Sequence, residues 1–217
     1  MRDNSIDVVA GALILFMIFG HVMSWTSLTE TCTFINLDRI LCFFMPWFFF
    51  KAGMFFKQTN LTEVLKAGYR RLLVPYILWG GVGIASYYMP AVILGREPLN
   101  DVILLEIKAI LLSGKIDGNS AIWFLLSLFF ARIIWHYLSK IGEKGYVVIT
   151  MIILSIIVIS LKQDIPIMAY PEYFYNTLLG VTFFSLGVYL KERQYQKRVF
   201  WISTLLYIVL LLVVCKG

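Results

Sequence analysis

Charged side chains are scarce in this sequence. Asp, Glu, Lys and Arg make up 15% of the 217 residues, while hydrophobic residues make up 60%. A soluble domain is nearer a quarter charged and half apolar, so the composition excludes an ordinary soluble domain. The mean hydropathy is +0.81, and runs of about 18 or more apolar residues recur, which is the signature of transmembrane helices.

Three further absences narrow the class of protein. The only cysteines are Cys32, Cys42 and Cys215, and an odd number without metal-like spacing argues against a disulfide framework or a metal site. Alternating segments of about ten residues, which a membrane β-barrel needs, are missing. No small-x-small cleavage site follows the first apolar run, so we interpret that run as a retained span and not as a signal peptide.

The apolar runs predict an all-α fold, a polytopic bundle of about seven transmembrane helices. The expected spans are residues 7–25, 38–56, 72–94, 121–138, 146–161, 173–190 and 199–215. A mixed segment at 97–116 predicts one amphipathic helix that lies at the membrane interface and does not cross it.

Basic residues predict the orientation of this bundle. With the N-terminus in the cytoplasm, 11 lysines and arginines fall in inner segments and 6 in outer segments, which follows the positive-inside rule. We therefore expect an inner or plasma membrane protein with a cytoplasmic N-terminus. The net charge of +6 belongs to these segments, so we expect no nucleic-acid partner.

The first apolar run ends in Gly20-His21. Histidine accepts a proton at neutral pH, which a general base must do, so His21 is the first candidate catalytic residue. The alternative is an interfacial histidine that water or a neighbouring group satisfies.

Basic side chains are also predicted near the inner side of the membrane. They are Lys51, Arg70, Arg71, Arg132 and His136. Paired arginines bind phosphates through bidentate, charge-assisted hydrogen bonds, so these residues could surround a vestibule for an anionic ligand. The simpler interpretation is that Lys51 reaches the inner surface along its stem and that the arginines only set the orientation.

Several motifs occur in an order that is typical of one family. They are Ile6-Asp7 followed by Gly11, Gly20-His21, the run from Met45-Pro46 to Gly53, Arg71-Leu72-Leu73 with Pro75-Tyr76, and Trp123-Phe124-Leu125. Their order and spacing, over most of residues 1–135, resemble the acyltransferase 3 family of integral membrane acyltransferases. We therefore treat residues 1–217 as a single acyltransferase-3-like domain.

The resemblance implies roles for particular residues. His21 falls on the histidine that ends the family's first span and would be catalytic. The family has a basic residue eleven positions earlier, where this chain has Ala10. Arg71 falls on the second arginine of the family's Arg-x-x-Arg pattern, whereas Gly68 stands at the first, so Arg70 or Lys66 would have to substitute. The family usually has a longer chain with more spans, so we expect the domain to be incomplete at its C-terminal end or to work with another copy as a homo-oligomer.

The leading hypothesis is an O-acyltransferase that moves an acyl group, most simply acetyl, from acyl-CoA to a hydroxyl of a cell-envelope or exported saccharide. Acetyl-CoA or another acyl-CoA would be the co-substrate, Arg71, Arg70, Lys51 and Arg132 would bind it, membrane lipid would surround the chain, and no metal is expected. One alternative is a transporter or flippase-like protein that uses Pro46 and the intramembrane charges as a gated pathway. Another is an inactive relative kept for assembly.

Overall fold

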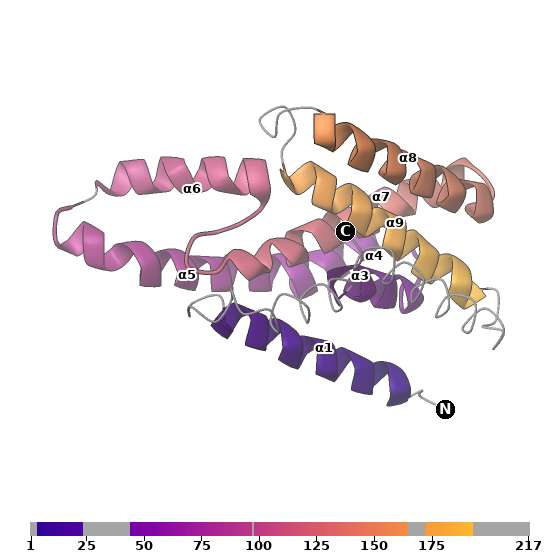
Figure 1. Cartoon of the computed structure of the whole chain (residues 1–217), viewed down its shortest axis with the longest axis horizontal. Coiled ribbons are helices and arrows are strands. Elements are labelled where there is room, and N and C mark those ends of the chain that lie inside the picture. Colours follow the sequence, from indigo (N-terminus) through magenta and orange to yellow (C-terminus); the bar gives the residue numbers. More distant parts are fainter. Residues whose placement is uncertain (1–3, 24–43, 97, 165–171, 193–217) are drawn as a thin grey trace. The chain divides into compact units, whose positions relative to one another are not determined.

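The computed structural model describes residues 4–23, 44–96, 98–164 and 172–192. These ranges are helical and contain no strand, which confirms the all-α class. The helices are α1 (Asn4–Met23), α3 (Phe44–Met54), α4 (Leu61–Gly68), α5 (Val74–Ile93), α6 (Leu99–Ser113), α7 (Trp123–Ile141), α8 (Lys144–Asp164) and α9 (Glu172–Glu192), as Figure 1 shows. Two short helices, the π-helix η2 (Tyr69–Leu73) and the 3-10 helix η3 (Ser120–Ile122), precede α5 and α7.

Three helical segments of the described residues are long and apolar enough to cross a membrane. They are Leu61–Ile93, Ser120–Ile141 and Tyr173–Lys191, and two shorter apolar helices cover Asp7–Val22 and Lys144–Val158. Three of the seven predicted spans are therefore found at full length, two are found as shorter apolar helices, and the second is described only within α3. The seventh predicted span, at 199–215, and all three cysteines lie outside the described residues. The segment at 97–116 forms α6, as predicted, and its position at a membrane interface stays a prediction.

The chain divides into two compact units. Residues 49–189 form one unit, and residues 1–48 with 190–217 form the other. Within the unit that includes residues 1–48, the ring of Phe16 on α1 meets the ring of Phe44 edge to face, with centroids 6.0 Å apart. The larger unit contains α4 to α8 and the main hydrophobic core.

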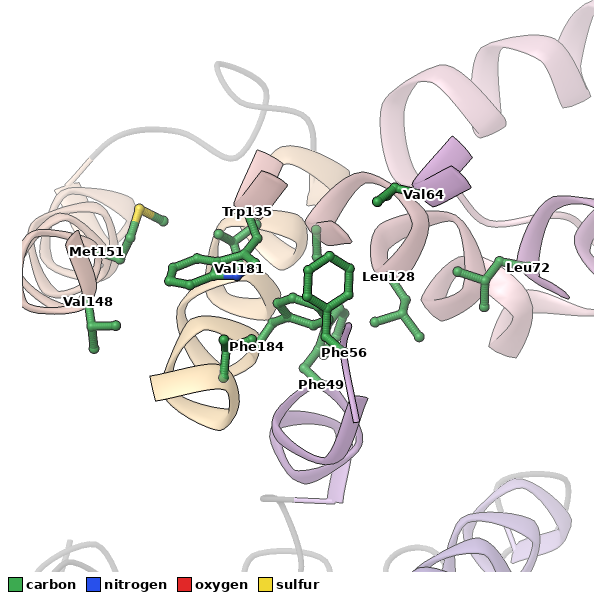
Figure 2. Packing of buried hydrophobic residues seen from close by; sticks show 12 residues of the cluster. Phe49, Phe56, Val64, Leu72, Leu128, Trp135, Val148, Met151, Val181 and Phe184 are labelled. Carbon is green, nitrogen blue, oxygen red and sulfur yellow. The ribbon is translucent and has the colours of Figure 1, made fainter. Parts of the chain in front are cut away.

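That core lies among α3, α4, α7, α8 and α9. Figure 2 shows Phe49 and Phe56 meeting Phe184 and Val181 of α9 and Leu128 of α7. The rings of Phe56 and Phe184 meet edge to face, with centroids 5.3 Å apart. Aromatic pairs in this geometry stabilise a fold beyond the area that they bury. The Phe-rich run at 48–56 therefore provides core packing on one side of α3.

Small and hydroxylated residues allow these helices to approach closely. A Cβ atom at Gly53 would overlap the carbonyl group of Phe184, and one at Gly187 would overlap the carbonyl group of Phe50, so α3 and α9 touch through their backbones. Buried hydroxyl groups also pair between helices, Ser127 with Thr177 at 3.1 Å. Both devices are typical of helix packing in membranes.

The helix that carries the paired arginines is longer than predicted. The expected span begins at residue 72, but α4, η2 and α5 form one continuous helical segment from Leu61 to Ile93. Asn60 caps its start, because its side-chain oxygen accepts the Glu63 backbone N–H at 2.9 Å. The Leu72–Ile93 part alone is roughly 33 Å long at 1.5 Å per residue, enough for a bilayer's hydrocarbon core. The arginines therefore precede the apolar part while remaining inside the helix.

The loop at residues 114–119 packs against the second half of α5. α6 runs back along α5 (Figure 1) and ends at this loop. Gly118 has a φ of 76°, a left-handed conformation that residues other than glycine adopt only at a cost. A Cβ at Gly118 would also overlap the carbonyl group of Gly83 on α5. The chain therefore turns at Asp117-Gly118-Asn119, and this turn lies against the backbone of α5.

Candidate active site

The two arginines at the start of the apolar part of α5 lie in a π-helical turn. Pro75 has no backbone N–H and cannot bond the carbonyl four residues earlier, which belongs to Arg71. In the turn before Pro75, the backbone N–H of Val74 bonds to the carbonyl of Tyr69, which is five residues earlier and not four. Arg70 and Arg71 are both exposed in this turn. Single π-helical turns inside α-helices are frequently found at functional sites.

Arg71 and Arg132 form the centre of the candidate site. The turn η2 packs against α7, and Arg71 lies close enough to Arg132 for their positive charges to repel each other. Arg132 is half-buried, so water screens this repulsion only in part. Arginine does not lose its proton in proteins. The pair is therefore a local concentration of positive charge suited to an anionic ligand.

The Arg132 side chain is supported from the core side by an aromatic ring. Its guanidinium carbon lies 5.7 Å from the centroid of the Phe56 ring, a distance at which a cation and a ring attract each other. Phe56 in turn meets Phe184 edge to face. The sequence does not indicate Phe56 as part of this site, because nothing in a run of phenylalanines distinguishes a ring that contacts a cation from one that packs in the core.

The glycine in the half-kept Arg-x-x-Arg pattern has a packing role here. Gly68 is buried, and a Cβ at this position would come within 2.7 Å of the Phe129 ring on α7. A larger side chain at Gly68 therefore requires Phe129 to move. Arg71 follows Gly68 by three residues. The positive charge on this segment is supplied by Lys66, Arg70 and Arg71, all of which are exposed.

The other basic residues of the predicted vestibule have different environments. Lys51 is half-buried in the last turn of α3 and has a further interaction of its own. His136 lies one turn after Arg132 and is 1% exposed, and neither of its ring nitrogens has a hydrogen-bond partner in the described residues. His136 therefore belongs to the interior of the unit, whereas Arg70, Arg71 and Arg132 reach or approach its surface.

His21 belongs to the other unit. It lies in the last turn of α1 with an exposed side chain and takes part in a further interaction. Ala10, where the family has a basic residue, is 7% exposed on the same helix.

Two further features concern Pro46 and possible metal ligands. Pro46 lies in α3, two residues after its first described residue, Phe44, and residue 42, whose carbonyl Pro46 cannot bond, lies outside the described residues. Within the described ranges, no group of three His, Cys, Asp or Glu side chains is arranged to hold a metal ion.

The larger unit contains groups that suit the binding of an anion, and the other unit contains a residue type that can accept a proton. Two guanidinium groups on neighbouring helices can bind phosphate oxygens through charge-assisted hydrogen bonds, and an exposed histidine on α1 can accept a proton.

Comparison with known proteins agrees with the order of motifs in the sequence. The family described as Acyltransferase domain, the acyltransferase 3 family, matches residues 3–216, nearly the whole chain. Neither the curated proteins nor the solved structures offer a match. The family match and the apolar helices together support a membrane acyltransferase. The chain therefore belongs to the acyltransferase 3 family.

Proposed function

We propose that the protein is an O-acyltransferase that moves an acyl group, most simply acetyl, from acyl-CoA to a hydroxyl of a cell-envelope or exported saccharide. The observation that carries this proposal is the packing of the η2 turn, which contains Arg71, against α7, which contains Arg132. An acyl-CoA donor carries several phosphate charges, and two guanidinium groups close together match that chemistry.

The donor is made in the cytoplasm, so this proposal includes a cytoplasmic N-terminus. The charge bias of 11 inner to 6 outer cations supports a cytoplasmic position for the η2 turn, which contains Arg70 and Arg71. Lys51 and Arg70 are proposed as additional contacts to the donor.

In the proposed reaction, a saccharide hydroxyl attacks the thioester carbonyl. His21 takes the proton of the hydroxyl as the new C–O bond forms, and the C–S bond breaks to release the thiolate of CoA. The thiolate then receives a proton, so the products are the ester and free CoA. This assignment of His21 rests on the family resemblance and on the capacity of histidine to act as a base near neutral pH.

The test is an incubation of membranes that contain the chain with acetyl-CoA labelled in the acetyl group. Label should appear in a saccharide fraction and should be released by mild alkali, as expected of an ester and not of an amide. In the His21→Ala variant the rate of transfer should fall by about 100-fold or more, the scale of a lost general base.

Two controls make the result decisive. His21→Asn keeps a hydrogen-bonding side chain without a titrating nitrogen and should do no better than alanine, while insertion into the membrane should be unchanged in both variants. Full transfer in either variant would refute the role of His21. If the wild-type chain transfers no label but moves intact donor or saccharide across the membrane, the enzyme hypothesis is wrong and the protein is a transporter.

A further inference from the structure

A buried carboxyl group lies on the inward face of α6. Val102 and Glu106 are the buried residues of this helix, and Glu106 is 3% exposed. One of its oxygens, Oε1, accepts the backbone N–H of Asp117 at 3.3 Å. The other, Oε2, is buried and has no hydrogen-bond partner among the described residues. A carboxylate in this position would leave a negative charge without compensation, which is costly away from water.

A second carboxyl group makes the position still less suitable for a charge. Asp117 lies in the 114–119 loop, and its Oδ2 accepts the hydroxyl of Tyr88 on α5 at 2.6 Å. The same Tyr88 hydroxyl lies beside Glu106. Glu106 therefore accepts the backbone N–H of Asp117, while the Asp117 carboxyl accepts the Tyr88 hydroxyl that lies beside Glu106. Two carboxyl groups that share a site do not both ionise readily.

Charged and titratable groups around this site supply little positive charge. Those on neighbouring segments are Tyr76 and Tyr88 on α5, Lys115 and Asp117 in the loop, and Tyr173 on α9. On α6 itself, Asp101 and Lys108 are exposed. Lys115 takes part in a further interaction, and the side chains that act on Glu106 among the described residues are those of Asp117 and Tyr88, neither of which is a cation.

We propose that Glu106 is a proton-binding site, which carries a proton at neutral pH and, with Tyr88 and Asp117, holds the 114–119 loop against α5. A proton on Glu106 removes one of two neighbouring negative charges and turns an oxygen without a partner into a hydrogen-bond donor. The Tyr88 oxygen can accept that bond while its hydroxyl donates to Asp117.

The electrostatic environment supports this geometry. Burial and, to a lesser extent, the charge of Asp117 raise the pKa of Glu106 above its ordinary value. When the proton leaves in alkaline solution, two adjacent carboxylates remain, one on α6 and one on the loop. Their repulsion weakens the attachment of the loop, so its closure depends on pH.

The test is infrared spectroscopy of the full chain in detergent or lipid, because the C=O band of a protonated carboxyl group is separate from the bands of carboxylates. The wild-type spectrum at pH 7 should contain a protonated-carboxyl band that is absent from Glu106→Gln. The band should disappear on titration to higher pH. Asp101→Asn, a change at an exposed carboxyl group of the same helix, is the matched control and should leave the band unchanged.

A second variant covers the case in which Glu106→Gln does not fold. Asp117→Asn removes the neighbouring negative charge and should move the midpoint of the band's titration to lower pH, and hydrogen exchange at the 114–119 loop should change with the same midpoint in the wild type. A wild-type chain with no protonated-carboxyl band at pH 7 would overturn the proposal. So would a band identical in Glu106→Gln, or loop exchange that responds to added Ca²⁺ but not to pH, which would indicate a cation site.

Discussion

Two groups of like charge lie close together near each end of α5, and the repulsion between them is relieved in a different way at each end. At its start, Arg71 lies near Arg132, and both side chains are exposed or half-buried. In its second half, Tyr88 bonds to Asp117 beside Glu106, where Glu106 is buried. The two places are about 25 Å apart at 1.5 Å per residue. Each contains a pair of groups that would repel if both were charged.

The chemistry of the side chains decides how each repulsion is relieved. Arginine keeps its proton under all ordinary conditions, so the basic pair can be relieved only by water or by a bound anion. A carboxyl group can take up a proton, so the acidic pair can be relieved without any ligand. The comparison teaches that a like-charge pair indicates a ligand site when its members cannot change their charge, and a proton site when they can.

The largest effect should come from the basic pair. A phosphate–arginine contact contributes roughly 1.5–3 kcal/mol, so Arg71→Ala should weaken acyl-CoA binding by about tenfold to a hundredfold. Arg71→Lys should recover only part of the affinity, because the planar fork is lost. The measurement is a titration of acyl-CoA against purified protein in detergent.

Arg96, an exposed arginine just beyond α5, provides the control for this titration. Arg96→Ala should bind the donor as the wild type does, and added salt should weaken the wild type more than Arg71→Ala. Equal affinities in the wild type, Arg71→Ala and Arg96→Ala would show that the donor does not bind at this end of α5.

A smaller effect should come from the turn that closes the other end. Gly118→Ala puts a side chain into a left-handed conformation, which costs roughly 1–2 kcal/mol, and directs a Cβ at the Gly83 carbonyl. The midpoint of thermal unfolding in detergent should therefore fall, while acyl-CoA binding at the basic pair should stay unchanged.

Gly142→Ala is the matched control for that substitution. Gly142 has an extended conformation, with a φ of −169°, and a Cβ there would have no neighbour within 4 Å among the described residues. An equal loss of stability in both variants would show that the 114–119 loop is not held by close contact with α5.

The sequence predicted the basic end of α5 better than the acidic end. Arg70 and Arg71 stand before an apolar run and fit both the positive-inside rule and the family pattern, so they were identified as candidates. The π-helical turn around them depends on how Pro75 is accommodated, and the ring of Phe56 beneath Arg132 depends on tertiary packing. Neither follows from spacing along the chain.

Glu106 shows why the acidic end was missed. On an amphipathic helix a glutamate is normally assigned to the polar face, so the pattern at 97–116 does not distinguish Glu106 from an exposed residue. A signal was present, because Glu106 is four residues after Val102 and four before Ile110 and therefore lies on their apolar stripe. Its proximity to Asp117, eleven residues later, depends on how the 114–119 loop folds back, which the sequence pattern does not specify.

The last effect to test is the pH dependence that Glu106 gives to stability. Its pKa is raised on folding, so between its ordinary value of about 4.3 and the raised value the folded chain binds more protons than the unfolded chain. Stability must then fall as pH rises through this window and stay at the lower level above it. Each unit of pKa shift corresponds to about 1.4 kcal/mol lost at high pH. Unfolding midpoints measured from pH 5 to pH 9 should therefore decline more steeply in the wild type than in Glu106→Gln, whose amide does not titrate, and Asp101→Asn should follow the wild type. A wild-type chain that becomes more stable over this range relative to Glu106→Gln would mean that Glu106 is ionised and paired, and the two ends of α5 would then both be ligand sites.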